Sequence, residues 1–153
     1  KVRKSIITSN NLSEVISKSI DLIKPTAINK NIKIINNVAD DVFALIDPDK
    51  IEQVFINLIH NSIDAIHDNG EIIFELKVLE NSVIVSLSDT GVGITEELKS
   101  KIFDLYFTTK NTGTGLGLGI VNNIIQEHRG KIYFESTGKG TTFYLELKRQ
   151  ENG

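Results

Sequence analysis

The sequence contains no cysteine, methionine or tryptophan, and only two of its 153 residues are proline. The absence of cysteine excludes disulfides, thiol catalysis and zinc–thiolate sites, and is compatible with a reducing compartment. The absence of methionine means that no initiator residue is present, so we expect the chain to be a piece of a longer protein. The charge, membrane attachment and oligomeric state of that parent protein are therefore open.

Long apolar runs and an excess of basic charge are missing as well. The longest uninterrupted apolar stretch covers residues 42–46, which is far too short to span a membrane. The formal net charge is −3 and no basic stripe is present, so the sequence gives no support for nucleic-acid binding. Hydrophobic residues make up 40% of the chain, enough for a core. We expect one globular domain over residues 1–153, cytoplasmic, monomeric in isolation and not inserted into a membrane.

Apolar residues recur at helical spacing in three segments, which have recognisable ends. Asn11 can cap the first helix, and Pro25 should kink or end it. Asp47 can cap the second helix, because proline follows it at the first helical position. Asn69 and Gly70 should close that helix. The third helix is predicted at residues 118–128.

Short apolar segments between these helices predict three pairs of strands. The pairs are residues 32–37 with 42–46, 72–79 with 83–87, and 132–135 with 142–147. The resulting order, αββαββαββ, is typical of an α+β domain. It favours one sheet with helices covering one face.

Two glycine-rich loops lie in the second half of the chain. Asp89-Thr90-Gly91-Val92-Gly93 is the first, and residues 113–119 carry glycine at every other position. Such a backbone can approach a ligand closely, and the second loop leads directly into a helix, whose N-terminus favours phosphate. The P-loop and Rossmann patterns are both absent. The loops therefore predict a nucleotide site of another type.

The second helix carries a polar stripe at the edge of its apolar face. Asn57, Asn61 and Asp64 fall at i, i+4 and i+7. The stripe could be solvated surface. Alternatively, the amide oxygens of the two asparagines could ligate a hard cation such as Mg²⁺, which keeps several waters and takes phosphates as ligands.

Two charged residues border the glycine loops. Asp89 could be a turn carboxylate, or it could accept a hydrogen bond from an amino group such as that of adenine. Lys110 could be solvated, or its ammonium group could meet a terminal phosphate. The residues by themselves leave both pairs of alternatives open.

Taken in order, these segments resemble the ATP-binding catalytic domain of sensor histidine kinases. Residues 57–65 resemble the N box of that family, 89–94 its first glycine box and 103–110 its F box, while 113–119 and 138–142 resemble the later glycine boxes. The match covers residues 10–148. The resemblance implies a Bergerat fold, a two-layer α/β sandwich with a mixed sheet of about five or more strands under three helices. It also implies a mobile ATP lid over residues 94–117.

The resemblance further implies roles for individual residues toward ATP and Mg²⁺. Asn61 would ligate the metal, Asn57 and Lys110 would lie by the phosphates, and these three would serve catalysis. Asp89 would accept the adenine amino group. The remaining nucleotide-binding residues would be Gly91, Gly93, Gly113, Thr114, Gly115, Leu116, Gly117 and Thr142. Asp64 stands where many members carry a basic residue, so no phosphate contact is assigned to it.

The implied activity is transfer of the ATP γ-phosphoryl group to a histidine on a separate dimerisation domain of the parent protein. A response regulator receiver domain would be a further partner. His60, His67 and His128 lack the sequence context of an acceptor histidine, so the acceptor must lie outside this chain. The alternatives are an ATP hydrolase related to gyrase, Hsp90 and MutL, a silent nucleotide-binding or scaffolding module, and a serine kinase of the anti-sigma-factor type. The hydrolases carry a glutamate at the position of Asn57, and an amide cannot accept a proton from water.

Overall fold

The computed structural model describes residues 4–102 and 117–149. Within these ranges the helices are α1 (Leu12–Asn29), α2 (Pro48–Ala65), α3 (Glu96–Lys99) and α4 (Gly117–Glu127). The strands are β1 (Thr8–Asn11), β2 (Ile32–Asn36), β3 (Phe43–Ile46), β4 (Gly70–Val78), β5 (Ser82–Asp89), β6 (Lys131–Thr137) and β7 (Gly140–Lys148).

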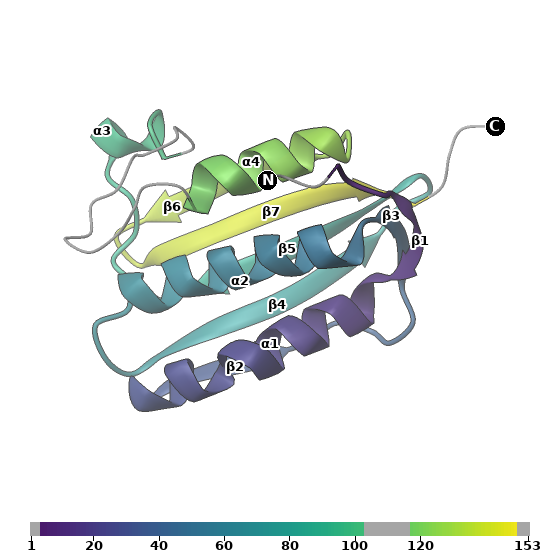
Figure 1. Cartoon of the computed structure of the whole chain (residues 1–153). Coiled ribbons are helices and arrows are strands. Elements are labelled where there is room, and N and C mark those ends of the chain that lie inside the picture. The colour runs from purple at the N-terminus through teal and green to yellow at the C-terminus, as the bar shows by residue number, and fades with distance from the viewer. Residues whose placement is uncertain (1–3, 103–116, 150–153) are drawn as a thin grey trace.

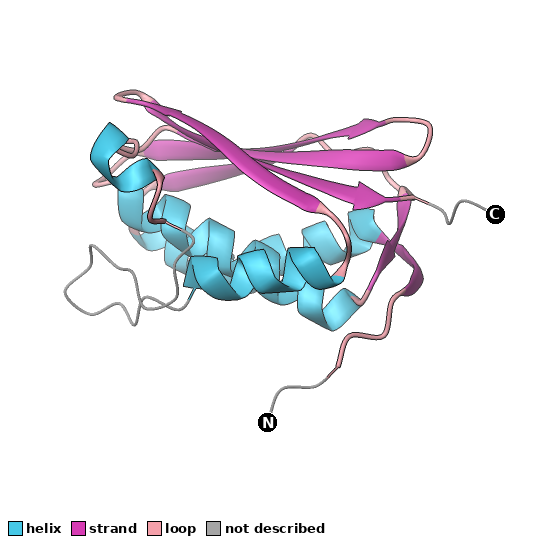
Figure 2. Cartoon of the chain, turned by 90° about the horizontal axis from the view of Figure 1, so that it is seen from above, coloured by secondary structure: helices cyan, strands magenta, loops and turns pink. Residues whose placement is uncertain are grey.

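Five of the strands form one mixed sheet in the order β2-β4-β5-β7-β6. Strand β2 runs parallel to β4, and the other neighbours are antiparallel. Helices α1, α2 and α4 cover one face of this sheet, and no helix of the described ranges covers the opposite, open face (Figures 1 and 2). The predicted two-layer α+β sandwich is confirmed.

The core lies between this sheet and the three helices. Ile51, Val54 and Phe55 of α2 are completely buried, and the Phe55 ring packs edge-on against that of Phe74 on β4 at a centroid distance of 5.8 Å. Strand β5 alternates strictly between buried and partly exposed residues, as expected when helices cover one face only. None of the described helices combines the length and hydropathy needed to cross a membrane.

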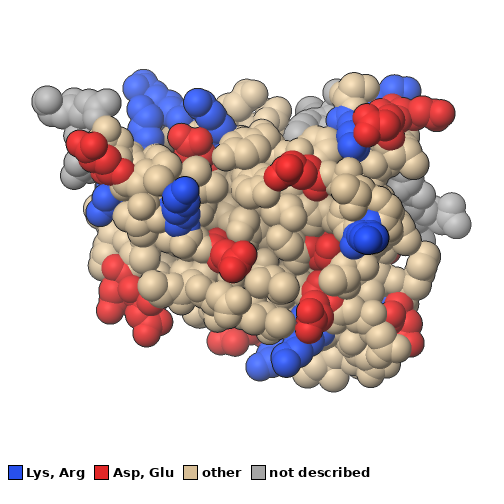
Figure 3. Space-filling view, turned by 180° about the vertical axis from the view of Figure 1, so that it is seen from behind, with Lys and Arg blue, Asp and Glu red and all other residues tan. Residues whose placement is uncertain are grey.

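The open face of the sheet carries charges of both signs. Figure 3 views the molecule from this side, and its acidic and basic side chains are interspersed without a basic stripe.

The two predicted helix ends compare differently with the structure. Of the two effects predicted for Pro25, a kink or an end, the end does not occur, because α1 continues to Asn29. Its last turn buries Ala27, so packing outweighs the hydrogen bond that proline cannot donate. Helix α2 ends at Ala65, before the predicted end at Asn69 and Gly70, because Ile66 takes an extended conformation. Gly70 instead opens β4, opposite Ile32 of β2.

The strands predicted at residues 32–37 and 42–46 belong to different sheets. Strand β2 joins the main sheet, while β3 pairs with β1 in a separate two-stranded sheet. This small sheet lies at one end of the molecule, near the right-hand edge of Figure 1. Strand β1 was not predicted, because its sequence, Thr-Ser-Asn-Asn, contains no apolar residue.

Candidate functional site

The site predicted from the sequence begins where the C-terminal end of α2 meets the loop after β5. The amide nitrogen of Val92 donates to the Ala65 carbonyl at 3.0 Å. Gly91 lies so close to Ala65 that a Cβ at position 91 would stand 2.7 Å from the Ala65 Cβ. Gly93 adopts a φ of 81°, and a Cβ there would collide with the Thr137 carbonyl. Both glycines are therefore required by contacts within the chain.

Asp89 is the last residue of β5, immediately before this loop in the chain, and is 8% exposed. Its Oδ1 atom accepts hydrogen bonds from the Gly91 amide at 2.9 Å and from the Thr141 amide at 3.3 Å. Burial raises the pKa of the Asp89 carboxyl, and the Gly91 amide, the nearby Ser62 hydroxyl and the Thr141 amide offset part of that rise. The result is a buried carboxylate held in place by two backbone donors.

Ser62, on α2, presents a buried hydroxyl toward the same carboxyl. The residue is 1% exposed, and its Oγ atom has no hydrogen-bond partner among the described residues. The hydroxyl nevertheless lowers the pKa of Asp89, so it lies near the carboxyl without reaching full hydrogen-bond geometry. A buried polar atom without a partner is uncommon and fits a site that a ligand or water completes. Ser62 was not among the predicted site residues, although a serine on the apolar face of a helix was a usable signal.

The polar stripe of α2 runs along the same half of the helix. Asn57 and Asn61 are partly buried and Asp64 is exposed, as expected for positions flanking an apolar face. Asn61 directly precedes Ser62 and lies one helical turn before Ala65, which contacts the β5 loop. The structure thus brings the Asn61 backbone to the Asp89 end of the sheet. His60 is exposed, away from the buried face of α2.

The strand register places Thr141 and Thr142 on opposite faces of the sheet. Thr142 pairs with Ser88, and their hydroxyl groups lie 2.8 Å apart on the open face of the sheet. Thr141 pairs with Asp89 instead, is 5% exposed, and lies on the side covered by the helices. Because side chains alternate along a strand, a shift of one residue moves the threonine to the other face. Thr141 is the residue beside the buried carboxylate.

Several predicted residues lie outside the described part of the chain. They are Lys110, Gly113, Thr114, Gly115 and Leu116, together with residues 103–116 of the predicted lid. Gly117 is described and opens α4, where an added Cβ would meet no atom within 4 Å. At the other end of the predicted lid, Ile102 is 4% exposed and belongs to the core.

A family model for the histidine kinase-, DNA gyrase B- and HSP90-like ATPases matches residues 46–151. The chain belongs to this family. The match includes α2, the β5 loop and the β6–β7 hairpin, which are the elements that meet at Asp89. The recognition of a histidine-kinase-type ATPase domain from its motifs is confirmed.

Relatives of this ATPase domain are sensor and sporulation kinases. The chain is 36% identical over 144 residues to sporulation kinase E of Bacillus subtilis (strain 168), covering 92% of the chain and 20% of the relative. It is 40% identical over 141 residues to the sensor histidine kinase ZraS of Salmonella typhi, covering 90% of the chain and 30% of the relative. The chain therefore spans about a fifth to a third of the curated relatives that it matches.

Solved structures agree with this assignment over nearly the whole ATPase domain. A nucleotide-free catalytic domain of histidine kinase ThkA superimposes with a TM-score of 0.87 at 38% identity, covering 94% of this chain and 96% of that one. ThkA in complex with the response regulator TrrA matches with a TM-score of 0.82 at 34% identity, covering 95% of this chain and 42% of that one. A domain of this extent has therefore been solved by itself.

The described residues fit an adenine nucleotide better than a metal bound by protein alone. The unpartnered Ser62 hydroxyl beside the Asp89 carboxyl fits a polar group such as a base edge. No cluster of three or more histidine, cysteine, aspartate or glutamate residues that could hold a metal occurs in the ranges 4–102 and 117–149. A magnesium ion here would depend on Asn61, on phosphate oxygens and on water.

Proposed function

We propose that this domain binds Mg-ATP and directs its γ-phosphoryl group to a histidine on a separate dimerisation domain of the parent protein. The observation that carries this proposal is the meeting of α2 and the β5 loop around Asp89, with Ser62 unpartnered beside it. The names of the relatives add support, because sporulation kinase E, ZraS and ThkA are all described as kinases.

Each residue is assigned one task in this proposal. Asp89 accepts the adenine amino group, because its Oδ1 already holds two amides and leaves Oδ2 as the acceptor for a base. Gly91 and Gly93 border the base, and Thr141 takes the place that the sequence analysis gave to Thr142. Asn61 supplies an oxygen ligand to the metal, with Asn57 beside the phosphates.

The second glycine box and the F box complete the assignment. Gly117 opens α4, and amides at the N-terminus of a helix favour phosphate. The residues preceding it are proposed to wrap and neutralise the phosphates, namely Lys110, Gly113, Thr114, Gly115 and Leu116. When bound, Mg-ATP supplies the phosphoryl group and the charge of the metal.

The chain itself positions the nucleotide and neutralises the charge of its phosphates, and the nucleophile comes from another domain. His128 is 3% exposed, and its Nδ1 and Nε2 atoms both make hydrogen bonds. Neither nitrogen is therefore available to accept the phosphoryl group. In the transfer, a bond forms from phosphorus to an imidazole nitrogen of the partner domain while the bond to the oxygen of ADP breaks. Because ATP is the substrate, we place the reaction in the cytoplasm, with a response regulator receiver domain as the next acceptor.

The binding half of the proposal is tested by titrating the chain with a non-hydrolysable ATP analogue and Mg²⁺. Asp89→Ala removes the proposed acceptor of the adenine amino group, and we expect at least about tenfold weaker binding. Thr142→Ala changes a hydroxyl on the open face of the sheet and serves as the control. Equal affinities for Asp89→Ala and the wild type would sink the proposed adenine contact.

The transfer half is tested by mixing the chain with its cognate dimerisation domain and labelled ATP. We expect an acid-labile label on the partner's histidine and little release of phosphate by the chain alone. Steady hydrolysis by the isolated chain would instead favour an ATP hydrolase. Binding without either activity would favour a silent nucleotide-binding module.

A further inference from the structure

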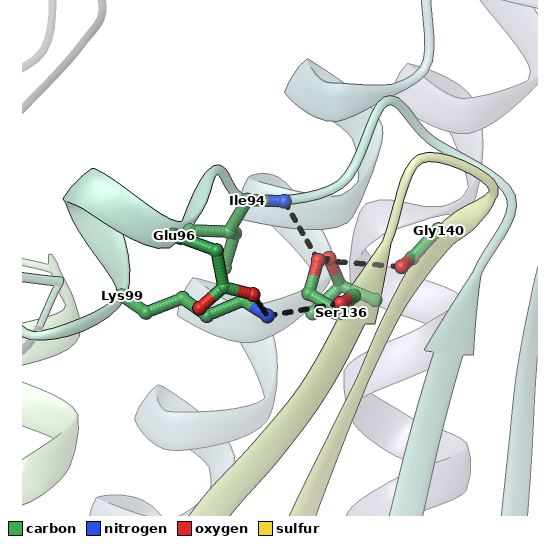
Figure 4. Close-up of polar contacts among 6 residues, drawn as sticks. Ile94, Glu96, Lys99, Ser136 and Gly140 are labelled. Carbon is green, nitrogen blue, oxygen red and sulfur yellow. Dashed lines mark hydrogen bonds and ion pairs between the residues drawn. The ribbon is translucent and has the colours of Figure 1, made fainter.

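A contact that has no part in the proposed function joins the β5 loop to the β6–β7 hairpin. The amide of Ile94, the first residue after the Gly91-to-Gly93 turn, donates to the Ser136 Oγ atom at 2.6 Å. The same Oγ atom lies 2.7 Å from the Thr141 hydroxyl and 3.3 Å from the Gly140 carbonyl. Figure 4 draws Ser136 at the centre of these contacts, between Ile94 and Gly140.

The backbone of Ser136 makes a second contact with the same segment. The Lys99 ammonium group donates to the Ser136 carbonyl at 3.1 Å and also pairs with the Glu96 carboxylate at 2.7 Å (Figure 4). Ser136 therefore holds residues 94–99 at two points, through its hydroxyl and through its carbonyl. The turn between these points and Asp89 contains Gly93, which abuts the Thr137 carbonyl.

The hydrogen-bond chain also reaches the buried carboxylate. Ser136 contacts the Thr141 side chain, and the Thr141 amide donates to Asp89 Oδ1 at 3.3 Å. The Ser136 hydroxyl has a single proton, which it can donate to Thr141 Oγ1 or to the Gly140 carbonyl while it accepts from Ile94. One serine thus fixes both the strand residue beside Asp89 and the start of the segment that leaves Asp89.

We propose that Ser136 is a positioning residue for nucleotide binding, which holds residues 91–94 in place beside Asp89 without touching the nucleotide. The inference rests on the proposed function, since it concerns the same site. A loop that carries two glycines loses much conformational entropy when it is fixed. Fixing it before the ligand arrives removes that loss from the binding step.

The test compares Ser136→Ala with Thr137→Ala and Ser136→Thr in this same chain. Ser136→Ala removes the acceptor of the Ile94 amide. Thr137→Ala removes the neighbouring hydroxyl, which accepts from the Lys139 amide in the hairpin turn. Ser136→Thr keeps the hydroxyl. The readouts are the affinity for an ATP analogue, the hydrogen exchange rate of the Ile94 amide without nucleotide, and the thermal midpoint.

We expect Ser136→Ala to bind the analogue roughly three- to tenfold more weakly, the effect of losing one hydrogen bond. The Ile94 amide should exchange faster, and the thermal midpoint should fall by no more than a few degrees, so that the variant is still folded when binding is measured. Ser136→Thr should restore both affinity and slow exchange. Thr137→Ala should match the wild type in all three.

The outcomes separate this role from the proposed function. Absence of analogue binding by the wild type would overturn the proposed function and this role together. Normal binding by both the wild type and Ser136→Ala would overturn this role alone. An equal loss of affinity for the analogue in Ser136→Ala and Thr137→Ala would also overturn it, because that result would assign the effect to the hairpin as a whole.

Discussion

At the scale of single residues, the chemistry of the site depends on how a carboxylate is kept inside the protein. Asp89 is 8% exposed and receives two backbone hydrogen bonds, yet burial still raises the pKa of its carboxyl. The ionised form of Asp89 therefore lowers the free energy of unfolding. Such a group is suited to accept a hydrogen bond that water does not supply.

The raised pKa of Asp89 predicts a pH-dependent gain in stability for Asp89→Asn. Between the ordinary pKa of 3.8 and the higher folded-state value, the folded protein binds more protons than the unfolded chain. The wild type therefore loses stability as pH rises through this window, while the neutral amide does not. Urea unfolding at pH values from about 4 to 8 should show the free-energy difference between variant and wild type growing with pH. Asp21→Asn, on the exposed side of α1, controls for the loss of one charge, and a difference that shrinks with pH would contradict this prediction.

Ser62 predicts a small effect on stability and a larger one on binding. Its buried Oγ atom has no hydrogen-bond partner among the described residues but lowers the pKa of Asp89, so the two contributions of Ser62→Ala oppose each other. We expect the free energy of unfolding to change by no more than about 1 kcal/mol. The same substitution should weaken binding of the ATP analogue, because it removes a polar group beside Asp89. Ser19→Ala is the matched control, since its equally buried hydroxyl donates to the Val15 carbonyl at 2.7 Å and its loss should destabilise the domain. A destabilised Ser62→Ala with normal affinity would show that Ser62 only supports the fold.

At the scale of elements, a buried histidine joins the helices that carry the site. The His128 Nδ1 atom lies 2.8 Å from the Ile124 carbonyl and must donate to it, so Nε2 accepts from the Asp47 amide at 3.0 Å. The Asp47 side chain caps α2 by accepting a hydrogen bond from the Lys50 amide, and it also accepts one from the Ile6 amide at 2.8 Å. The end of α4, the start of α2 and the segment before β1 thus meet at one polar cluster.

Removing the imidazole should therefore destabilise the domain without altering the site directly. His128→Leu replaces the imidazole with an apolar side chain of similar size and leaves the buried Asp47 amide without its acceptor. We expect a loss of about 1–3 kcal/mol in the free energy of unfolding, measured with urea. His67→Leu, on an exposed position, should change it by no more than about 0.5 kcal/mol. Equal, small effects of the two variants would mean that the polar cluster contributes nothing measurable to the free energy of unfolding.

At the scale of the whole molecule, sequence patterns predicted the layers better than their connections. The alternation of residues in β5 and the apolar face of α2 were sufficient for a sheet with helices on one side. The pairing of β1 with β3 is set by tertiary contacts, and neither strand's partner could be read from local periodicity. In the candidate site, motif order predicted Asp89, but local sequence cannot resolve the register difference of one residue that separates Thr141 from Thr142. Ser136 was missed because its role depends on a contact across 42 residues of chain.

Nucleotide binding should stabilise the entire domain, and the metal should account for part of that effect. A ligand that binds only the folded state adds about 2.7 kcal/mol at a concentration one hundred times its dissociation constant. For a domain of this size, that gain corresponds to a rise of roughly 5–10 °C in the thermal midpoint.

We expect a larger rise in the thermal midpoint with ATP analogue and Mg²⁺ than with the analogue and a chelator. Asn61→Ala should reduce the first rise to the level of the second, because it removes the proposed protein ligand of the metal. Asn29→Ala, an exposed amide at the end of α1, should keep the full difference. If the wild type gains equally with and without Mg²⁺, Asn61 holds no metal, and the phosphates are neutralised by other groups of the protein.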